Sequence, residues 1–231
     1  MKRFIKIVIR ILAIILGIAL LLLAVIYFGS KIASFRKSVE NPVYGPKKEW
    51  VFKATFFDAY GKTIQSDTLI LTTYNERFLL MQNKITWSLN KKGDDAEAVE
   101  ITGIIETEKE IWIHPPRFAG YFEFTEYAPF PEVKFPILPN NQWKGSLSLG
   151  TYATKESGNQ IKKEYSIHSI DTLSSIPLCR EIQITGTGIS GLGNYINEFT
   201  YNEIEGFTYM RYTKKNGERL IIELLGSYST Q

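Results

Sequence analysis

The pattern of apolar and polar positions divides the chain into two parts. From Ile11 to Ser30 no residue is charged and most are apolar, and a helix of this length spans roughly 30 Å, the thickness of the hydrocarbon core of a bilayer. From Glu49 onward, apolar and polar residues alternate between turn signals, with many β-branched and aromatic residues. The sequence therefore predicts one N-terminal transmembrane helix followed by an antiparallel all-β domain.

This pattern gives three expected parts: a signal-anchor transmembrane helix over residues 1–30, a stalk over residues 31–48 and an antiparallel β domain over residues 49–231. A cleaved signal peptide is the alternative for the first part, because "MKRFIKIVIR" is typical of a basic leader. The apolar run is longer than a leader requires, and "YFGSKIASF" offers no small-residue cleavage site. Basic residues lie on both sides of the run, so orientation depends on the ten-residue basic tail, which favours an N-terminus inside.

Within the β domain, several alternating runs are typical of strands. They cover residues 49–57, 66–75, 77–90, 96–108 and 110–114. The clearest hairpin joins Phe207–Thr213 to Glu218–Leu225, across a turn that ends in Asn216 and Gly217, residue types that tolerate a positive φ. We expect a strongly curved antiparallel sheet or an open barrel.

A segment of different composition interrupts these strands. Residues 114–140 hold six of the nine prolines, and because proline donates no backbone hydrogen bond, part of the segment must be loop or edge strand. Seven aromatic residues in the same segment argue against disorder. It is expected to be an ordered excursion over the sheet or a lid.

The stretch "GTGISGLG", from Gly186 to Gly193, contains the spacing G-x-G-x-x-G of a dinucleotide-binding fingerprint. That fingerprint needs a helix after the glycines, whereas the residues that follow are β-branched and aromatic. The nucleophile pattern G-x-S-x-G is also one position out of register around Ser190. We expect a glycine-rich connection between two strands, and no cofactor.

Charge separates the two parts of the chain as well. Residues 1–37 carry seven of the 27 Lys and Arg side chains and no acid, so that the other 20 stand against 24 Asp and Glu side chains. The basic start suits anionic lipid headgroups, while the net acidic domain excludes nucleic acid as a partner. The single cysteine, Cys179, lies in an alternating run and is expected to be an inert core residue.

The chain offers little catalytic or metal-binding chemistry. Its two histidines, His114 and His168, have no partner at metal-ligand spacing, so no metal is expected. An acid–base site for hydrolysis could combine His114, Arg117, Glu123 and Glu126, which share the proline-rich segment. The favoured alternative is that His114 ends a strand and bonds to a neighbour, while the other three are solvated.

The aromatic residues allow a ligand-binding hypothesis. Most are expected to be core, but a curved sheet with more apolar surface than it covers could hold an acyl chain. Six aromatic residues of the proline-rich segment would close over that cavity as a lid: Phe118, Tyr121, Phe122, Phe124, Phe130 and Phe135. Core packing is favoured over the cavity.

Four stretches, "EGFTYMRYTKKNGERLIIEL", "IPLCREIQITGTG", "IHPPR" and "APFPEVKFP", resemble a family of uncharacterised bacterial envelope proteins over most of residues 49–225. The closing hairpin is also similar to the curved sheets of lipoprotein-carrier-like domains, which implies acyl-chain binding. This chain departs from such carriers in its apolar N-terminal run. The apolar run and its favoured orientation, taken together with this resemblance, predict a bacterial inner-membrane protein with a periplasmic C-terminal domain. The resemblance assigns no functional residue.

Together these features favour a non-catalytic binding module, held at the membrane, for a hydrophobic small molecule, a lipid or an envelope protein. A structural or assembly partner ranks second, and a hydrolase that uses His114 ranks third.

Overall fold

The computed structural model describes residues 2–34, 39, 42–78, 82–91, 96–148, 160–172, 179–190 and 193–229. The chain divides into two compact units, Met1–Lys37 and Ser38–Gln231. Residues 79–81 of the third predicted strand, residues 92–95 of the turn after it, and Gly191 and Leu192 lie outside the described residues.

The first unit contains one helix, α1 (Lys2–Ser34). It contains no proline, two glycines and many Leu, Ile and Ala residues, a composition that helices accept well. Its large apolar side chains, where described, are exposed. Among the described residues, no helix combines the length with the apolar character that a membrane crossing requires, so the predicted transmembrane helix is not supported.

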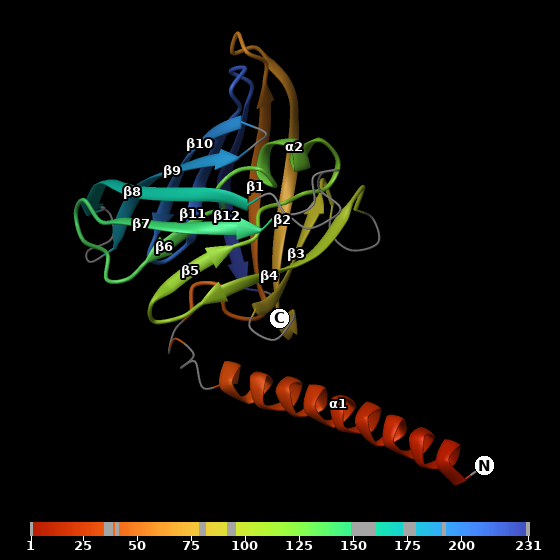
Figure 1. Cartoon of the computed structure of the whole chain (residues 1–231). Coiled ribbons are helices and arrows are strands. Elements are labelled where there is room, and N and C mark those ends of the chain that lie inside the picture. The colour runs from red at the N-terminus through yellow and green to blue at the C-terminus, as the bar shows by residue number, and fades with distance from the viewer. Residues whose placement is uncertain are drawn as a thin grey trace. The chain divides into compact units, whose positions relative to one another are not determined.

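The second unit is a 12-stranded antiparallel sheet that curves into a nearly closed barrel (Figure 1). The strands are β1 (Lys48–Phe57), β2 (Thr63–Phe78), β3 (Gln82–Leu89), β4 (Val99–Glu106), β5 (Glu110–Ile113), β6 (Glu132–Lys134), β7 (Gln142–Ser148), β8 (Gln160–Thr172), β9 (Arg180–Ser190), β10 (Gly193–Asn202), β11 (Gly206–Thr213) and β12 (Arg219–Ser229). Their order in the sheet is β6-β5-β4-β3-β2-β1-β12-β11-β10-β9-β8-β7. The predicted all-β class and the strong curvature are confirmed.

Strand β1 shows how alternation produces this sheet. Trp50, Phe52, Ala54 and Phe56 are buried on the inner face, while Lys53 is exposed. Each large apolar side chain removed from water in this way contributes roughly 1.5–3 kcal/mol. The inner face of the barrel is therefore the main hydrophobic core.

The predicted closing hairpin is present. Strand β11 pairs with β12, with Tyr209 opposite Glu223 and Thr213 opposite Arg219. Gly217 ends the turn with a φ of 91°, a conformation that glycine adopts without steric penalty. Its N–H donates to the Lys214 carbonyl at 3.0 Å.

The barrel closes at two places that differ in kind. At the first, here termed the seam, β1 pairs with β12 along its whole length, from Lys48 opposite Ser229 to Phe57 opposite Arg219. At the second, termed the gap, β6 and β7 are the two ends of the sheet and form no ladder with each other in the described residues. The seam is a ladder of backbone hydrogen bonds with one register shift, between Val51 and Phe52, and the gap is bridged by side chains.

The principal bridge across the gap is an ion pair between Lys163 and Glu132. Lys163 Nζ, from β8, lies 2.5 Å from Glu132 Oε2 on β6, and both side chains are buried. Gly145 on β7 lies opposite Lys163. A Cβ at Gly145 would lie 2.8 Å from Lys163 Cε, so the absence of a side chain there gives the lysine room to reach β6.

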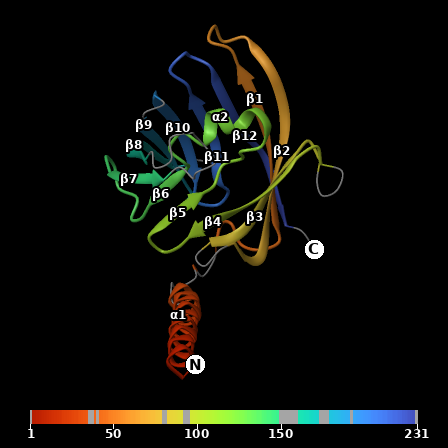
Figure 2. The ribbon, with the colours of Figure 1, turned by 45° about the vertical axis from the view of Figure 1, so that its right-hand side comes forward.

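The proline-rich segment lies inside the curve of the sheet (Figure 2). It forms a short 3-10 helix (Ala119–Tyr121), α2 (Phe122–Thr125) and β6, and residues 128–133 are all buried. Asn197 Nδ2 donates to the Pro129 carbonyl and Tyr165 Oη to the Phe130 carbonyl, each at 2.7 Å. Because buried carbonyls need donors, these two side chains satisfy backbone that cannot join a ladder.

Part of the predicted stalk packs against the barrel. Val43 and Tyr44 are buried, and the Tyr44 and Trp50 rings lie 4.9 Å apart between centroids. Tyr44 Oη accepts a hydrogen bond from the Phe207 N–H at 2.7 Å. Gly206 has a φ of 84° and lies so close to the tyrosine ring that a Cβ there would overlap it. Residues 43 and 44 therefore belong to the core of the β domain.

Candidate functional site

The glycine-rich stretch at residues 186–193 belongs to two paired strands. Gly186 and Gly188 lie in β9, and β10 begins at Gly193, opposite Ser190. A Cβ at Gly186 would lie 3.0 Å from the Tyr165 ring and 3.2 Å from Pro129 Cβ, so the glycine allows the proline-rich segment to approach the sheet. Residues 193–202 form a strand where a dinucleotide fingerprint needs a helix. The predicted connection between two strands lies between Ser190 and Gly193, because Gly186 and Gly188 belong to β9 itself.

Most of the six aromatic residues predicted to close a ligand cavity take part in core packing. Tyr121, Phe124 and Phe130 are buried. Tyr121 and Phe124 contact the Phe56 ring edge-on, with centroids 4.8 and 5.5 Å apart. These contacts are those of an ordinary aromatic core.

The other three aromatic residues, Phe118, Phe122 and Phe135, are partly exposed. The Phe118 ring packs on Tyr121, with centroids 5.3 Å apart, and the Phe122 ring packs on Tyr127 at 5.5 Å. The ring centroids of Phe135 and Tyr201 lie 6.4 Å apart. Among the six aromatic residues, Phe135 lines a crevice in the described part of the chain. Ligand contact by all six stays a prediction.

The crevice beside Phe135 has a volume of about 340 Å³. It forms where the segment before β1, the β4–β5 turn, the residue after β6 and the end of β10 meet. The lining residues are Val39, Val43, Glu106, Thr107, Glu108, Ile111, Phe135, Tyr201 and Glu203. Five of them present apolar or aromatic surface and three present carboxylates, while no Lys or Arg is among them.

Glu106 fixes one wall of the crevice. Its two carboxylate oxygens accept hydrogen bonds from the backbone N–H groups of Val43, at 2.6 Å, and Tyr44, at 2.9 Å. Burial raises the pKa of Glu106, and these two hydrogen bonds and the charge of Lys48 oppose that rise. The carboxylate thus holds the segment before β1 in position beside the core.

Glu203, which follows β10 and is distant from Glu106 in the sequence, lines the same crevice. Arg180 Nη2 lies 2.5 Å from Glu203 Oε1, and Arg180 Nε donates to Glu203 Oε2 at 3.0 Å. This bidentate pair orients the carboxylate and compensates its charge.

The residues of the predicted acid–base site are only partly brought together. Arg117 Nε lies 2.6 Å from Glu100 Oε1, and Arg117 Nη1 lies 3.4 Å from Glu126 Oε2. Burial raises the pKa of Glu126, against the opposing charge of Arg117. Glu100, on β4, is the principal partner of Arg117. No local sequence pattern points to this pair, because the two residues meet only through the fold.

His114 and Glu123 stand apart from this ion pair. Burial, and then the charge of Arg117, lower the pKa of His114 to about 4. Its Nδ1 lies 3.1 Å from the Pro115 carbonyl, and its ring lies 4.6 Å from that of Phe130. Glu123 is exposed and its Oε2 lies 2.9 Å from Lys214 Nζ. Of the four residues of the predicted acid–base site, Arg117 and Glu126 contact each other. His114 and Glu123 have other partners, so the hydrogen-bonded set that a hydrolase would need is incomplete.

Two further sequence expectations concern Cys179 and metal binding. Cys179 is buried directly before β9, with its Sγ 3.2 Å from Asn202 Oδ1, so its place in the core is confirmed. Across the described part of the chain, no three His, Cys, Asp or Glu side chains gather as a metal site would require.

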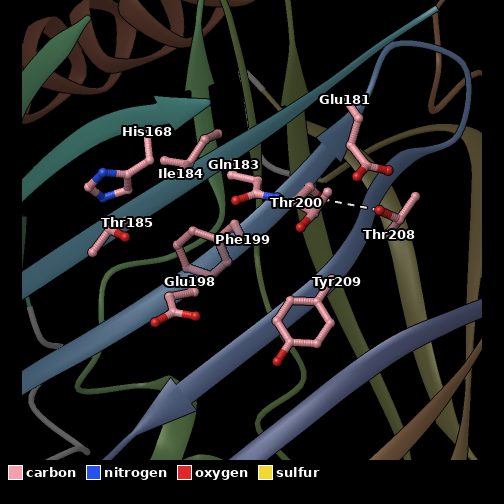
Figure 3. A pocket seen from close by; sticks show the side chains of 10 residues that line it. All are labelled: His168, Glu181, Gln183, Ile184, Thr185, Glu198, Phe199, Thr200, Thr208 and Tyr209. Carbon is pink, nitrogen blue, oxygen red and sulfur yellow. Dashed lines mark hydrogen bonds between the residues drawn. The ribbon is translucent and has the colours of Figure 1, made fainter. Parts of the chain in front are cut away.

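A second hollow, of about 650 Å³, lies on the outer face of β8, β9, β10 and β11 (Figure 3). It is lined by His168, Glu181, Gln183, Ile184, Thr185, Glu198, Phe199, Thr200, Thr208 and Tyr209. Ile184 and Phe199 are buried toward the core, so the other eight side chains make the outer surface of this groove. Sequence analysis did not single out this groove.

No protein-family model matches the chain, and no curated protein matches it. Among solved structures, the chain is similar to a protein from Bacteroides fragilis that is inferred to be exported and has a YmcC-like fold. The TM-score is 0.43 at 7% identity, over 80% of this chain and 96% of that chain. It is also similar to an inferred lipoprotein from Parabacteroides distasonis, with a TM-score of 0.46 at 9% identity, over 82% of this chain and 100% of that chain. Both similarities are structural, at low sequence identity.

Proposed function

We propose that the β domain is a non-catalytic binding module that takes a small amphipathic molecule in the crevice beside Phe135. The apolar part of the ligand lies against Val43, Phe135 and Tyr201, and its polar end lies near the carboxylates. The observation that carries the proposal is the crevice itself, in which apolar walls and carboxylates face the same space. Ligand pockets in proteins commonly combine apolar walls with a few polar groups in this way.

The charges at the crevice favour one kind of polar end. Glu106, Glu108 and Glu203 line it, with no Lys or Arg among the lining residues. Arg180, outside the lining, compensates the charge of Glu203, so the preference for one polar end depends on Glu106 and Glu108. A carboxylate headgroup would meet like charge there, whereas an amine would meet opposite charge. We therefore expect an amine or a neutral donor, and this narrows the acyl-chain hypothesis drawn from the sequence to ligands without an anionic head.

The size of the crevice limits the ligand as well. A volume of about 340 Å³ is at the lower end of the range for small-molecule sites, roughly 300–1,000 Å³. The proline-rich segment and buried side chains such as Trp50, Trp87 and Tyr212 occupy space inside the barrel. The site therefore suits a short apolar chain.

A lipid surface is the proposed partner of the N-terminal unit. The described side chains of α1 from Ile11 to Ile26 include many large apolar groups that are more than half exposed, and exposed apolar surface of this extent is typical of contact with a membrane or a partner. Lys6 and Arg10 precede them and would meet anionic headgroups. With this attachment, the β domain would bind its ligand at the cell envelope.

The test compares two probes of equal chain length, octylamine and octanoate, on the full chain kept in solution by an amphipathic polymer. Isothermal titration is expected to show octylamine binding at least tenfold more tightly than octanoate. Phe135→Ala should weaken octylamine binding about tenfold, because the variant removes one apolar wall. Native mass spectrometry of the same preparation would identify any copurifying amphiphile.

Phe122→Ala is the matched control, since Phe122 is a partly exposed phenylalanine of the same segment that does not line the crevice. It should leave octylamine binding unchanged. Thermal melting shows that each variant is folded. Equal affinity of the two variants for octylamine, or tighter binding of octanoate, would contradict the proposal.

A further inference from the structure

The groove of Figure 3 is formed by two irregularities of the sheet. In the pairing of β8 with β9 the register shifts between Ile167 and Ser169, which leaves His168 as an extra residue on β8. In the pairing of β10 with β11 it shifts at Thr200 and Tyr201, which leaves Thr208 as an extra residue on β11. Such β-bulges bend a strand, increase its twist and redirect side chains.

Both bulge residues line the groove. His168 and Thr208 lie on its two outer strands, and β9 and β10 run between them (Figure 3). Thr208 Oγ1 donates to the Thr200 carbonyl at 3.5 Å. The backbone irregularities of β8 and β11 therefore shape the groove on both of its outer strands.

The side chains between the bulges carry both donors and acceptors. Gln183 on β9 is the register partner of Thr200 on β10, and Thr200 is in turn the register partner of Tyr209 on β11, so the three residues form one row across the sheet. Thr185 and Glu198 form the parallel row, and Arg211 on β11 forms an ion pair with Glu198. The rows combine hydroxyl groups, an amide, a carboxylate and one phenol ring on a single surface.

Several of these groups are free to bind a ligand. Glu181, Gln183 and Thr185 make no side-chain hydrogen bond or ion pair with any part of the chain that the structure describes. Gln183 offers both a donor and an acceptor, and Glu181 offers two acceptor oxygens. The charge of Glu198 is already compensated by Arg211.

We propose that this groove is a second binding site, which takes a neutral polyhydroxylated ligand, a short saccharide. Sugar hydroxyls both donate and accept, so they match a surface of mixed amide, hydroxyl and carboxylate groups. The Tyr209 ring supplies an apolar face for the C–H surface of a sugar. An anion would face Glu181, and a simple cation would leave the donors of Gln183 and the threonines unused.

This site is separate from the crevice of the proposed function. Strand β10 contributes Thr200 and Glu198 to the groove and Tyr201 to the crevice. Since successive residues of a strand point to opposite faces, one strand serves an outer site and an inner site. Binding at one can therefore be tested while the other is intact.

The test uses maltotetraose and chitotetraose as neutral probes, and spermine as the cationic alternative, on the full chain in the same amphipathic polymer. A sugar-based detergent is avoided. Amide chemical shifts are expected to change on β8–β11, around residues 183–185 and 198–200, on addition of at least one tetrasaccharide. Gln183→Ala and Tyr209→Ala should each weaken that binding by about tenfold or more.

Gln65→Ala is the matched control, because Gln65 is an exposed glutamine of β2 that does not line the groove. It should leave saccharide binding unchanged. The inference is overturned if neither tetrasaccharide binds at millimolar concentration, if spermine alone shifts these residues, or if both groove variants bind as the unaltered chain does. Octylamine titration of the Gln183→Ala variant shows separately whether the crevice still functions.

Discussion

The seam and the gap close the same barrel by different means. At the seam, β1 and β12 share a backbone ladder from Lys48 to Phe57, so closure is distributed over many equivalent hydrogen bonds. At the gap, the described closure depends on a few side chains, chiefly Lys163 with Glu132, Tyr165 with the Phe130 carbonyl and Asn197 with the Pro129 carbonyl. A ladder tolerates most side-chain substitutions, whereas the gap depends on particular residues.

The composition of the proline-rich segment explains this difference. Pro129 and Pro131 have no N–H to donate, so the chain before β6 cannot extend a ladder toward β7. Its carbonyls still need donors, and the inner face of β8–β10 supplies them through side chains. The gap is therefore the place where single substitutions should have the largest effects on stability.

The largest effect is expected for Lys163→Ala. The variant leaves the buried Glu132 carboxylate without its principal partner, although Lys134 Nζ remains 3.5 Å from Glu132 Oε1. Loss of one member of a buried pair costs about 3–5 kcal/mol. Urea unfolding followed by tryptophan fluorescence measures the change in the free energy of unfolding.

The double variant Glu132→Leu with Lys163→Met checks the physical reason. Replacing a buried pair by apolar side chains of similar size is often neutral or stabilising, so the double variant should recover most of the loss. A double variant as unstable as Lys163→Ala would show that the lysine stabilises the gap by some means other than its charge.

A smaller effect, which depends on pH, is expected from His114. Its pKa is lowered from 6.5 to about 4 by burial, so between these values the unfolded chain holds a proton that the folded chain does not. The contribution of neutral His114 to the free energy of unfolding is complete above pH 6.5 and is lost as pH falls toward 4. The total loss in the free energy of unfolding is about 3 kcal/mol.

The measurement compares the free energy of unfolding at pH 7.5 and pH 4.5 for the unaltered chain and for His114→Gln. The variant should lose less stability on acidification. Burial raises the pKa values of Glu106 and Glu126, so protonation of these two carboxylates on acidification favours the folded state and opposes the effect of His114. The unaltered chain and His114→Gln share this contribution. The difference between their pH profiles therefore reports on His114. Parallel pH profiles would contradict the assigned pKa.

The smallest effect is expected at the seam, for Lys53→Ala. Lys53 is exposed on β1 opposite Glu223 of β12, and surface substitutions away from special features change stability by about 0.5 kcal/mol or less. Hydrogen exchange of the β1 and β12 amides should stay as slow as in the unaltered chain. A loss as large as that of Lys163→Ala would remove the distinction between seam and gap.

Local patterns were sufficient to predict much of the sheet. The alternation of apolar and polar residues predicted β1, β4 and β5, and the Asn216-Gly217 turn predicted the β11–β12 hairpin. These features could be predicted because they depend on residues that are neighbours in the sequence. The path of the proline-rich segment was not predictable in the same way. Its place inside the barrel depends on Gly186, Asn197 and Tyr165, which come close to it only in the folded chain.

The candidate sites show the same limit. The sequence pointed to Phe135 through the aromatic content of its segment, and Phe135 does line the crevice. Glu106 and Tyr201 were missed, because their approach to Phe135 depends on which strands pair. The outer groove was missed because it depends on two register shifts, at His168 and Thr208, and neither residue carries a bulge signal in its local sequence.

The pairing of β1 with β12 also determines when the barrel can be completed. Every other ladder joins strands that follow one another along the chain. Most of these pairs can form as local hairpins soon after synthesis, although the proline-rich segment separates β5 from β6. Strand β1 can pair with β2 early, but its other edge has no partner until residues 219–229 have emerged. Since contacts between distant parts of a chain form slowly, the emerging protein carries an open β edge for most of its synthesis, and this is the interval in which protection from aggregation matters most.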